Sequence, residues 1–128
     1  MSGLRASTLV KTSTELIPIS DIKSNEHVYN NLNKQVRVTR NLVTDNVDNF
    51  ILIKQNALGK NMPEHDIYIM KNNVIIINGI DIIIDKLING ISIININLEK
   101  PESVYHLCTE NKTFISVENI FINSTQHN

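Results

Sequence analysis

Cysteine is nearly absent from the sequence, since Cys108 is the single one among 128 residues. No disulfide can form within the chain, and no site with several cysteine ligands can hold a metal. The four histidines are scattered and lack the spacing of zinc ligands, so we expect neither a metal nor a cofactor. Charge is nearly balanced, with a net charge of −1. Because nucleic-acid binding usually requires a basic surface that neutralises phosphates, we expect no nucleic-acid partner.

Long apolar runs are also missing. The first ten residues, MSGLRASTLV, lack the apolar segment of a secretion signal. The most apolar stretch, residues 74–98, is interrupted by asparagine, glycine and aspartate, so it does not read as a membrane span. We therefore expect a protein of the cytoplasm or of a virion that is not secreted and has no membrane contact.

Isoleucine and asparagine dominate what is present, with 22 and 19 residues. Isoleucine favours strands, whereas asparagine favours turns and left-handed backbone positions. With 41% hydrophobic residues, residues 1–128 are long enough to form one domain with its own core. We expect an all-β domain of many short strands, without a helix longer than about two turns.

Alternating apolar residues and turn signals place the expected strands at 8–12, 16–19, 35–40, 50–54, 66–70, 74–77, 79–85, 91–98, 103–108 and 113–122. Within 91–98, Ile91 and Ile93 have the opposite parity to Ile94 and Ile96. One face of a strand cannot bury both sets, so a bulge or bend is expected near Ile93. Residues 85–90 are expected to form a short helical turn that ends at a glycine.

The stretch DIYIMKNNVIIING, residues 66–79, contains two apolar runs separated by Lys71-Asn72-Asn73. These three residues have two possible readings. They are the tip of a hairpin, or they are what remains of an active site.

Four stretches in order resemble the Hint domain, the fold shared by hedgehog autoprocessing domains and inteins, and most of all its bacterial and large-DNA-virus branch. They are GLRASTLVKTSTELIPISDIKSNEHV, NFILIKQNALGKNMPEHDIYIMKNNVII, DKLINGISI and VYHLCTENKTFISVENI. Together they cover most of residues 3–124 and leave 125–128 as a polar tail. The resemblance implies a horseshoe of short strands in which the N- and C-terminal segments lie side by side.

The resemblance also implies where an active site would lie. In an active Hint domain, a histidine that ends the turn helps an N-terminal Cys or Ser attack its own upstream carbonyl. Here the histidine position falls on Asn73 and the nucleophile position on Gly3, while a second family histidine falls on Asn111. Asparagine cannot transfer a proton near neutral pH, and glycine offers no nucleophile. Thr8 and His106 match a threonine and a histidine that are common in the family.

Each remaining candidate also has an ordinary structural explanation. Thr8 is a β-branched residue where a strand is expected, and His106 fits a strand histidine that bonds to the backbone. Cys108 follows His106 by two positions on one strand, which favours a buried, inert thiol over a nucleophile. Asn123-Ser124 resembles the junction that ends an intein, but Ile122 precedes it in place of the usual histidine, which favours a polar tail.

Three functions follow from these observations. The first is a degenerate Hint domain that has lost self-cleavage and splicing, so that no residue is catalytic. The second is residual autoproteolysis or splicing, with His106 and Asn123 as the weak catalytic candidates. The third is a structural or interaction module, such as a component of a virus particle, that binds a protein partner or itself through exposed strand edges.

Overall fold

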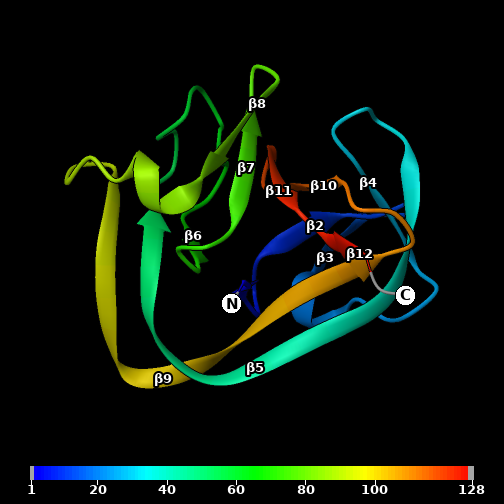
Figure 1. The fold of residues 1–128 in the computed structure, drawn as a ribbon, viewed down its shortest axis with the longest axis horizontal. Coiled ribbons are helices and arrows are strands. Elements are labelled where there is room, and N and C mark those ends of the chain that lie inside the picture. Colours follow the sequence, from blue (N-terminus) through cyan, green and yellow to red (C-terminus); the bar gives the residue numbers. More distant parts are fainter. Residues whose placement is uncertain (1, 127–128) are drawn as a thin grey trace.

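Strands make up most of residues 2–126, the part of the chain that the computed structural model describes (Figure 1). Two short 3-10 turns are the helical elements of that part, so the prediction of an all-β domain is confirmed. The elements are β1 Leu4–Arg5, β2 Leu9–Lys11, β3 Leu16–Pro18, η1 Ile19–Asp21, β4 His27–Tyr29, β5 Gln35–Ile53, β6 Ile67–Ile69, β7 Val74–Ile77, β8 Ile80–Ile83, η2 Ile84–Leu87, β9 Ile93–Thr109, β10 Phe114–Val117, β11 Ile120–Asn123 and β12 Thr125–Gln126.

Two long strands, β5 and β9, run antiparallel through the whole domain as a bent ribbon (Figure 1). They have 19 and 17 residues, so the expected short strands 35–40 and 50–54 are parts of one continuous strand. The pairing is interrupted by register shifts between Val38 and Arg40, between Thr44 and Val47, and between Val47 and Asn49. Unpaired residues at such shifts increase strand twist and bend the ribbon.

The strands form two sheets of six strands each. One has the order β12-β9-β1-β6-β5-β4, with β5 and β9 also paired, and the other has the order β3-β2-β10-β11-β7-β8. In the first sheet, β1 and β12 pair with the same strand, on the side of β9 away from β5: Leu4 lies opposite Tyr105 and Thr125 lies opposite Cys108. The predicted adjacency of the terminal segments is therefore confirmed. Thr125 and Gln126, which we expected in a polar tail, form β12, and residues 127–128 lie outside the described residues.

The interruption expected near Ile93 is a bend and not a bulge, since residues 90–92 bend directly before β9 begins. Ile93 pairs with Ile53, and the register then continues without a shift as far as Asn97, which lies opposite Asn49. Ile91 precedes the strand and is 78% exposed, so it does not compete for the buried face. The helical turn expected at 85–90 is a 3-10 turn at Ile84–Leu87.

Lys71-Asn72-Asn73 is not the tip of a hairpin. The segment leaves β6 in the first sheet and enters β7 in the second, so it carries the chain from one sheet to the other. The hairpin partner of β7 is β8, which follows through Asn78-Gly79. Within residues 2–126, no helix is long and apolar enough to cross a membrane.

Buried aliphatic side chains from both sheets form one main core, and a smaller cluster lies inside the bend of the ribbon. The smaller cluster contains Val47, Phe50 and Val104, with Tyr68 and Met70 packed against it. The Phe50 and Tyr68 rings meet edge to face at 6.2 Å between centroids. This cluster fixes β5, β6 and β9 around the first residues of β1.

We expect Ile51→Ala to lower the free energy of unfolding by about 2–5 kcal/mol, because it leaves a cavity among buried neighbours. Ile51 is 1% exposed. The matched change Ile91→Ala removes the same atoms at an exposed site and is expected to stay within about 0.5 kcal/mol of the parent. Urea denaturation measures both. Equal losses would contradict the placement of Ile91 outside the sheet.

Candidate functional site

The crossing between β6 and β7 lies against the backbone of Gly3. The Met70 N–H donates to the Gly3 carbonyl at 3.0 Å, and the Asn73 N–H closes the turn onto the Met70 carbonyl at 3.1 Å. The Asn73 side chain is fully buried. Its Oδ1 accepts a hydrogen bond from the Gly3 N–H at 2.8 Å. The two positions that the resemblance assigns to nucleophile and histidine are therefore in direct contact.

Asn73 also reaches the far end of the chain. Its Nδ2 donates to Oδ1 of Asn123 at 3.0 Å, and that oxygen also accepts the Val74 N–H at 2.8 Å. Gly3, Asn73 and Asn123 thus form a continuous chain of amides that joins β1, the crossing turn and β11. Amides donate and accept hydrogen bonds, but they do not exchange a proton near neutral pH. The arrangement holds three segments together and offers no general base.

Residue 3 has no space for a side chain. A Cβ built on Gly3 would lie 2.7 Å from Cγ2 and 2.8 Å from Cβ of Val104. Val104 is fully buried and packs in the cluster of Val47 and Phe50. Such contacts are shorter than van der Waals separation, so the space that a nucleophile would occupy is filled by β9.

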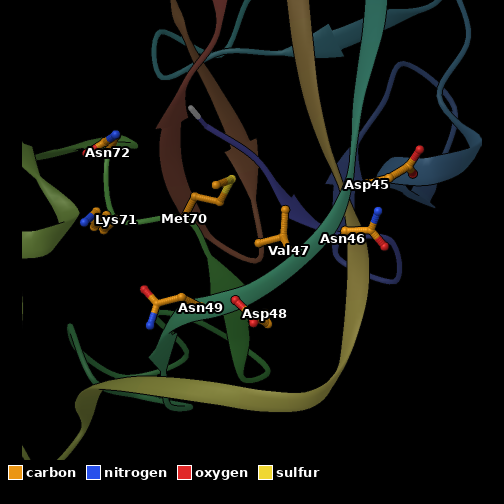
Figure 2. Close-up of a pocket in the computed structure, with 8 residues that line it drawn as sticks. All are labelled: Asp45, Asn46, Val47, Asp48, Asn49, Met70, Lys71 and Asn72. Atoms are coloured by element: carbon orange, nitrogen blue, oxygen red, sulfur yellow. The ribbon is translucent and has the colours of Figure 1, made fainter.

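A pocket of about 380 Å³ opens beside the crossing turn (Figure 2). In Figure 2 the side chains of Val47, from β5, and Met70 point toward each other across its floor. Carboxylates, amides and one ammonium group surround them: Asp45, Asn46, Asp48, Asn49, Lys71 and Asn72. The lining contains no cysteine, serine or histidine, the residue types of the nucleophile and the base that the Hint resemblance implies.

His106 lies in β9 one residue beyond the pair of Tyr105 with Leu4, which brings its backbone next to the start of β1. Its side chain is 8% exposed, and Nε2 lies 2.6 Å from Oγ1 of Thr125. Burial disfavours the charged imidazolium and lowers the pKa of His106. The partner of His106 is a side chain of β12 and not the backbone carbonyl that we expected.

Thr8 and Asn111 are not joined to the amide chain by any hydrogen bond in the described part of the protein. Thr8 directly precedes β2, and its hydroxyl donates to the Arg5 carbonyl at 2.7 Å. Asn111 is exposed in the connection from β9 to β10, and its carbonyl accepts the Thr109 hydroxyl at 2.6 Å. Of the five positions that the resemblance marked, the structure therefore links Gly3 and Asn73 directly and adds Asn123.

Cys108 and Ser124, the other potential nucleophiles near the site, are both buried. Cys108 is 1% exposed, and burial raises the pKa of its thiol, as expected for an inert cysteine. Ser124 is 1% exposed, its N–H donates to the Thr113 carbonyl at 2.8 Å, and its hydroxyl lies 2.7 Å from that of Thr109. The residue after Asn123 is thus part of the core and not of a tail.

A second polar cluster lies apart from the amide chain and was not expected from the sequence. Glu64, His65 and Glu118 bring one nitrogen and two oxygen donors within 4.8 Å of one another. Nδ1 of His65 and Oε2 of Glu118 are 2.8 Å apart, and this hydrogen bond raises the pKa of His65. The two residues are 53 positions apart, so no local spacing in the sequence could reveal them. The pair joins His65, whose side chain is 66% exposed in a loop, to Glu118 of the β10–β11 turn, whose side chain is 5% exposed.

The pKa values of the two histidines should lie on opposite sides of the ordinary histidine value of about 6.5. We expect NMR titration to give a pKa above this value for His65 and a pKa below it for His106. Because folded His106 resists protonation, the unfolded chain binds more protons as pH falls below about 6.5, and stability falls with it. His106→Gln should weaken this acid sensitivity, and Glu118→Gln should return His65 toward its ordinary value. A higher pKa for His106 than for His65 would contradict the assignment.

No protein-family model and no curated protein sequence matches the chain. Solved structures do match it over nearly its whole length. The bacterial intein-like domain from Clostridium thermocellum has a TM-score of 0.76 at 14% identity, covering 98% of this chain and 99% of that one. The DnaB intein from Synechocystis sp. PCC 6803 has a TM-score of 0.68 at 14% identity, with coverage of 98% and 99%. The gp41-1 intein has a TM-score of 0.67 at 12% identity, with the same coverage. The chain therefore has the intein-like fold that the Hint resemblance implied.

Proposed function

We propose that this chain is a Hint-type domain that no longer cleaves or splices itself. The observation that carries the proposal is the buried hydrogen bond from the Gly3 N–H to Oδ1 of Asn73, 2.8 Å long. In the chemistry that the resemblance implies, a histidine at the turn acts on the peptide bond ahead of the N-terminal nucleophile. Here the contact between the two positions persists, but neither residue has the group that the reaction needs.

Three features act against the first step of self-cleavage, in which the side chain of residue 3 would attack its own upstream carbonyl. Gly3 has no atom that can attack a carbonyl, Asn73 cannot transfer a proton, and Val104 fills the space beside Gly3. Removing a general acid or base alone typically costs ~10²–10⁴-fold in rate. Removing a nucleophile and its base together costs on the order of a millionfold, since they act as one unit. We infer that hydrolysis ahead of Gly3 proceeds no faster than for an ordinary peptide bond.

The geometry around Asn123 also acts against cleavage at the C-terminal side. Cyclisation would require Nδ2 of Asn123 to attack its own backbone carbonyl and the Ser124 nitrogen to leave. Two hydrogen bonds to Oδ1 orient the amide toward Asn73 and Val74 and withdraw electron density from Nδ2. The Ser124 N–H is held by the Thr113 carbonyl. These contacts support a structural role for Asn123.

A structural or interaction module, in the cytoplasm or in a virus particle, is the second candidate. The supporting feature is the edge strand β8, on which Ile80 is 63% and Ile83 is 44% exposed. Exposed strand edges present unpaired backbone groups to another chain. Native mass spectrometry of the purified protein tests self-association, since a monomer across the accessible concentration range argues against it.

A reporter protein fused upstream of Met1 should stay attached for days, with or without added thiol or hydroxylamine. The reason is that residue 3 has no side chain from which a reactive ester or thioester could form. Intact-mass measurement follows both ends of the fusion. Release of the reporter near residue 3, or a cut after Asn123, would overturn the proposal in favour of residual autoproteolysis.

Gly3→Ala should lower the free energy of unfolding by about 1–3 kcal/mol, because the new methyl group overpacks against Val104. The same substitution should cost less in a Val104→Ala background, where removal of the γ carbons lets β1 and β9 adjust. Ser13→Ala, in an exposed turn, is the matched control. Denaturant unfolding of the four chains completes the cycle. Strict additivity would show that residue 3 is not confined by Val104.

A further inference from the structure

The sequence contains two Asn-Gly pairs, Asn78-Gly79 and Asn89-Gly90. Both glycines are exposed, with φ of +79° and +75°, and a Cβ on either would meet nothing within 4 Å. The two pairs therefore share their chemistry, their exposure and their left-handed glycine. They differ in how the structure holds the asparagine side chain and the glycine nitrogen.

Asn89 is held by a dense set of hydrogen bonds. Its Oδ1 accepts the backbone N–H groups of Ile91, Ser92 and Ile93 at 2.8, 2.9 and 3.0 Å. Its Nδ2 donates to Oγ of Ser92 at 2.9 Å, and the Gly90 N–H donates to the Ile93 carbonyl at 3.2 Å. Neither the side-chain amide nor the following nitrogen can move without breaking several of these contacts.

Asn78 has none of this support. It forms with Gly79 the two-residue turn between β7 and β8, which closes at the pair of Ile77 with Ile80. Within residues 2–126, neither the Asn78 side chain nor the Gly79 N–H has a hydrogen-bond partner. Glycine adds no side chain that could shield its nitrogen. Within the described residues, no hydrogen bond therefore holds the Gly79 nitrogen away from the side-chain carbonyl carbon of Asn78.

We propose that Asn78 is a site of spontaneous deamidation and that Asn89 is protected from it by the fold. The Gly79 nitrogen attacks Cγ of Asn78 and forms a new C–N bond, while the bond from Cγ to Nδ2 breaks. The proton lost by the Gly79 nitrogen leaves with Nδ2 as ammonia, and a cyclic succinimide remains. Water then opens the ring at either carbonyl, which gives aspartate or isoaspartate at position 78. No oxidant, reductant or enzyme is required.

The products change an edge of the second sheet. Both add a carboxylate at the tip of the hairpin, one residue from Gly79 and close to Asp81 of β8. Isoaspartate also adds a methylene group to the main chain of a two-residue turn, which shifts the spacing that closes Ile77 onto Ile80. The modification therefore acts on β8, the edge strand with the exposed side chains of Ile80 and Ile83. It does not depend on whether the domain cleaves itself.

The test follows both pairs in one sample. The purified protein is kept at mildly alkaline pH in native buffer and, in parallel, in concentrated urea, and tryptic peptides are analysed by tandem mass spectrometry. Cleavage after Lys71 and Lys86 places Asn78 and Asn89 in different peptides. In native buffer we expect Asn78 to deamidate at least about tenfold faster than Asn89. This ratio corresponds to a free energy of about 1.4 kcal/mol for breaking the contacts that hold Asn89. In urea the two rates should converge, because the difference comes from the fold.

A variant separates protection from sequence context. Ser92→Ala removes the acceptor of the Asn89 Nδ2 and should raise the rate at Asn89 in native buffer, while the rate at Asn78 stays unchanged. Ser24→Ala, at an exposed serine in another part of the chain, is the matched control and should change neither rate. Equal native rates at the two pairs, faster modification of Asn89, or a difference that persists in urea would each overturn the proposal.

Discussion

The antiparallel pairing of β5 with β9 is the interaction on which the rest of the structure depends. The two strands pair from Val38 with Thr109 at one end to Ile53 with Ile93 at the other. Both terminal strands, β1 and β12, add to β9, and β4 and β6 add to β5. Because each short strand has only two or three residues, it gains its stability from the long strand beside it. The shape of the ribbon thus decides where every other element of this sheet can lie.

The amide chain of Gly3, Asn73 and Asn123 gives the buried side chain at position 73 a structural role. A buried donor or acceptor without a partner costs about 1–3 kcal/mol, so a side chain at position 73 must still satisfy the Gly3 N–H. Asparagine does so and also pairs with Asn123. The same contact that would place a histidine for catalysis serves here to bind β1 and β11 to the crossing turn.

Sequence patterns predicted those features that depend on local chemistry. Isoleucine-rich alternation gave the strands, and the resemblance placed residue 73 near residue 3, which the hydrogen bond between them bears out as a contact. The parity argument at Ile93 correctly required an interruption, which is the bend at residues 90–92, but it counted Ile91 as part of the strand, whereas the turn held by Asn89 ends just before Ile93. The hairpin reading of Lys71-Asn72-Asn73 failed for a different reason. Which sheet a strand joins depends on partners far away in the sequence, as β7 with β11.

Contacts between distant residues were beyond local reasoning for the same reason. Val104 lies next to Gly3 because β1 pairs with β9. His65 contacts Glu118 because the loop before β6 lies on the β10–β11 turn. Ser124 was expected in a tail because Ile122 precedes Asn123 in place of the usual histidine, but Thr109 and Thr113 provide Ser124 with hydrogen-bond partners in the interior. A polar residue near the end of a segment stays exposed only when the interior offers it no hydrogen-bond partners.

The placement of β1 and β12 on the same side of β9 has a consequence for how such a domain can be combined with others. Leu4 and Thr125 lie opposite Tyr105 and Cys108, on the side of β9 that β5 leaves free and three residues apart along the strand. Three residues of a strand span about 10 Å. A polypeptide can therefore enter and leave the domain through a gap not much wider than a single helix. The whole domain could therefore be inserted into a surface loop of a host protein. The host segments on either side of the insertion would remain close enough to fold as one domain.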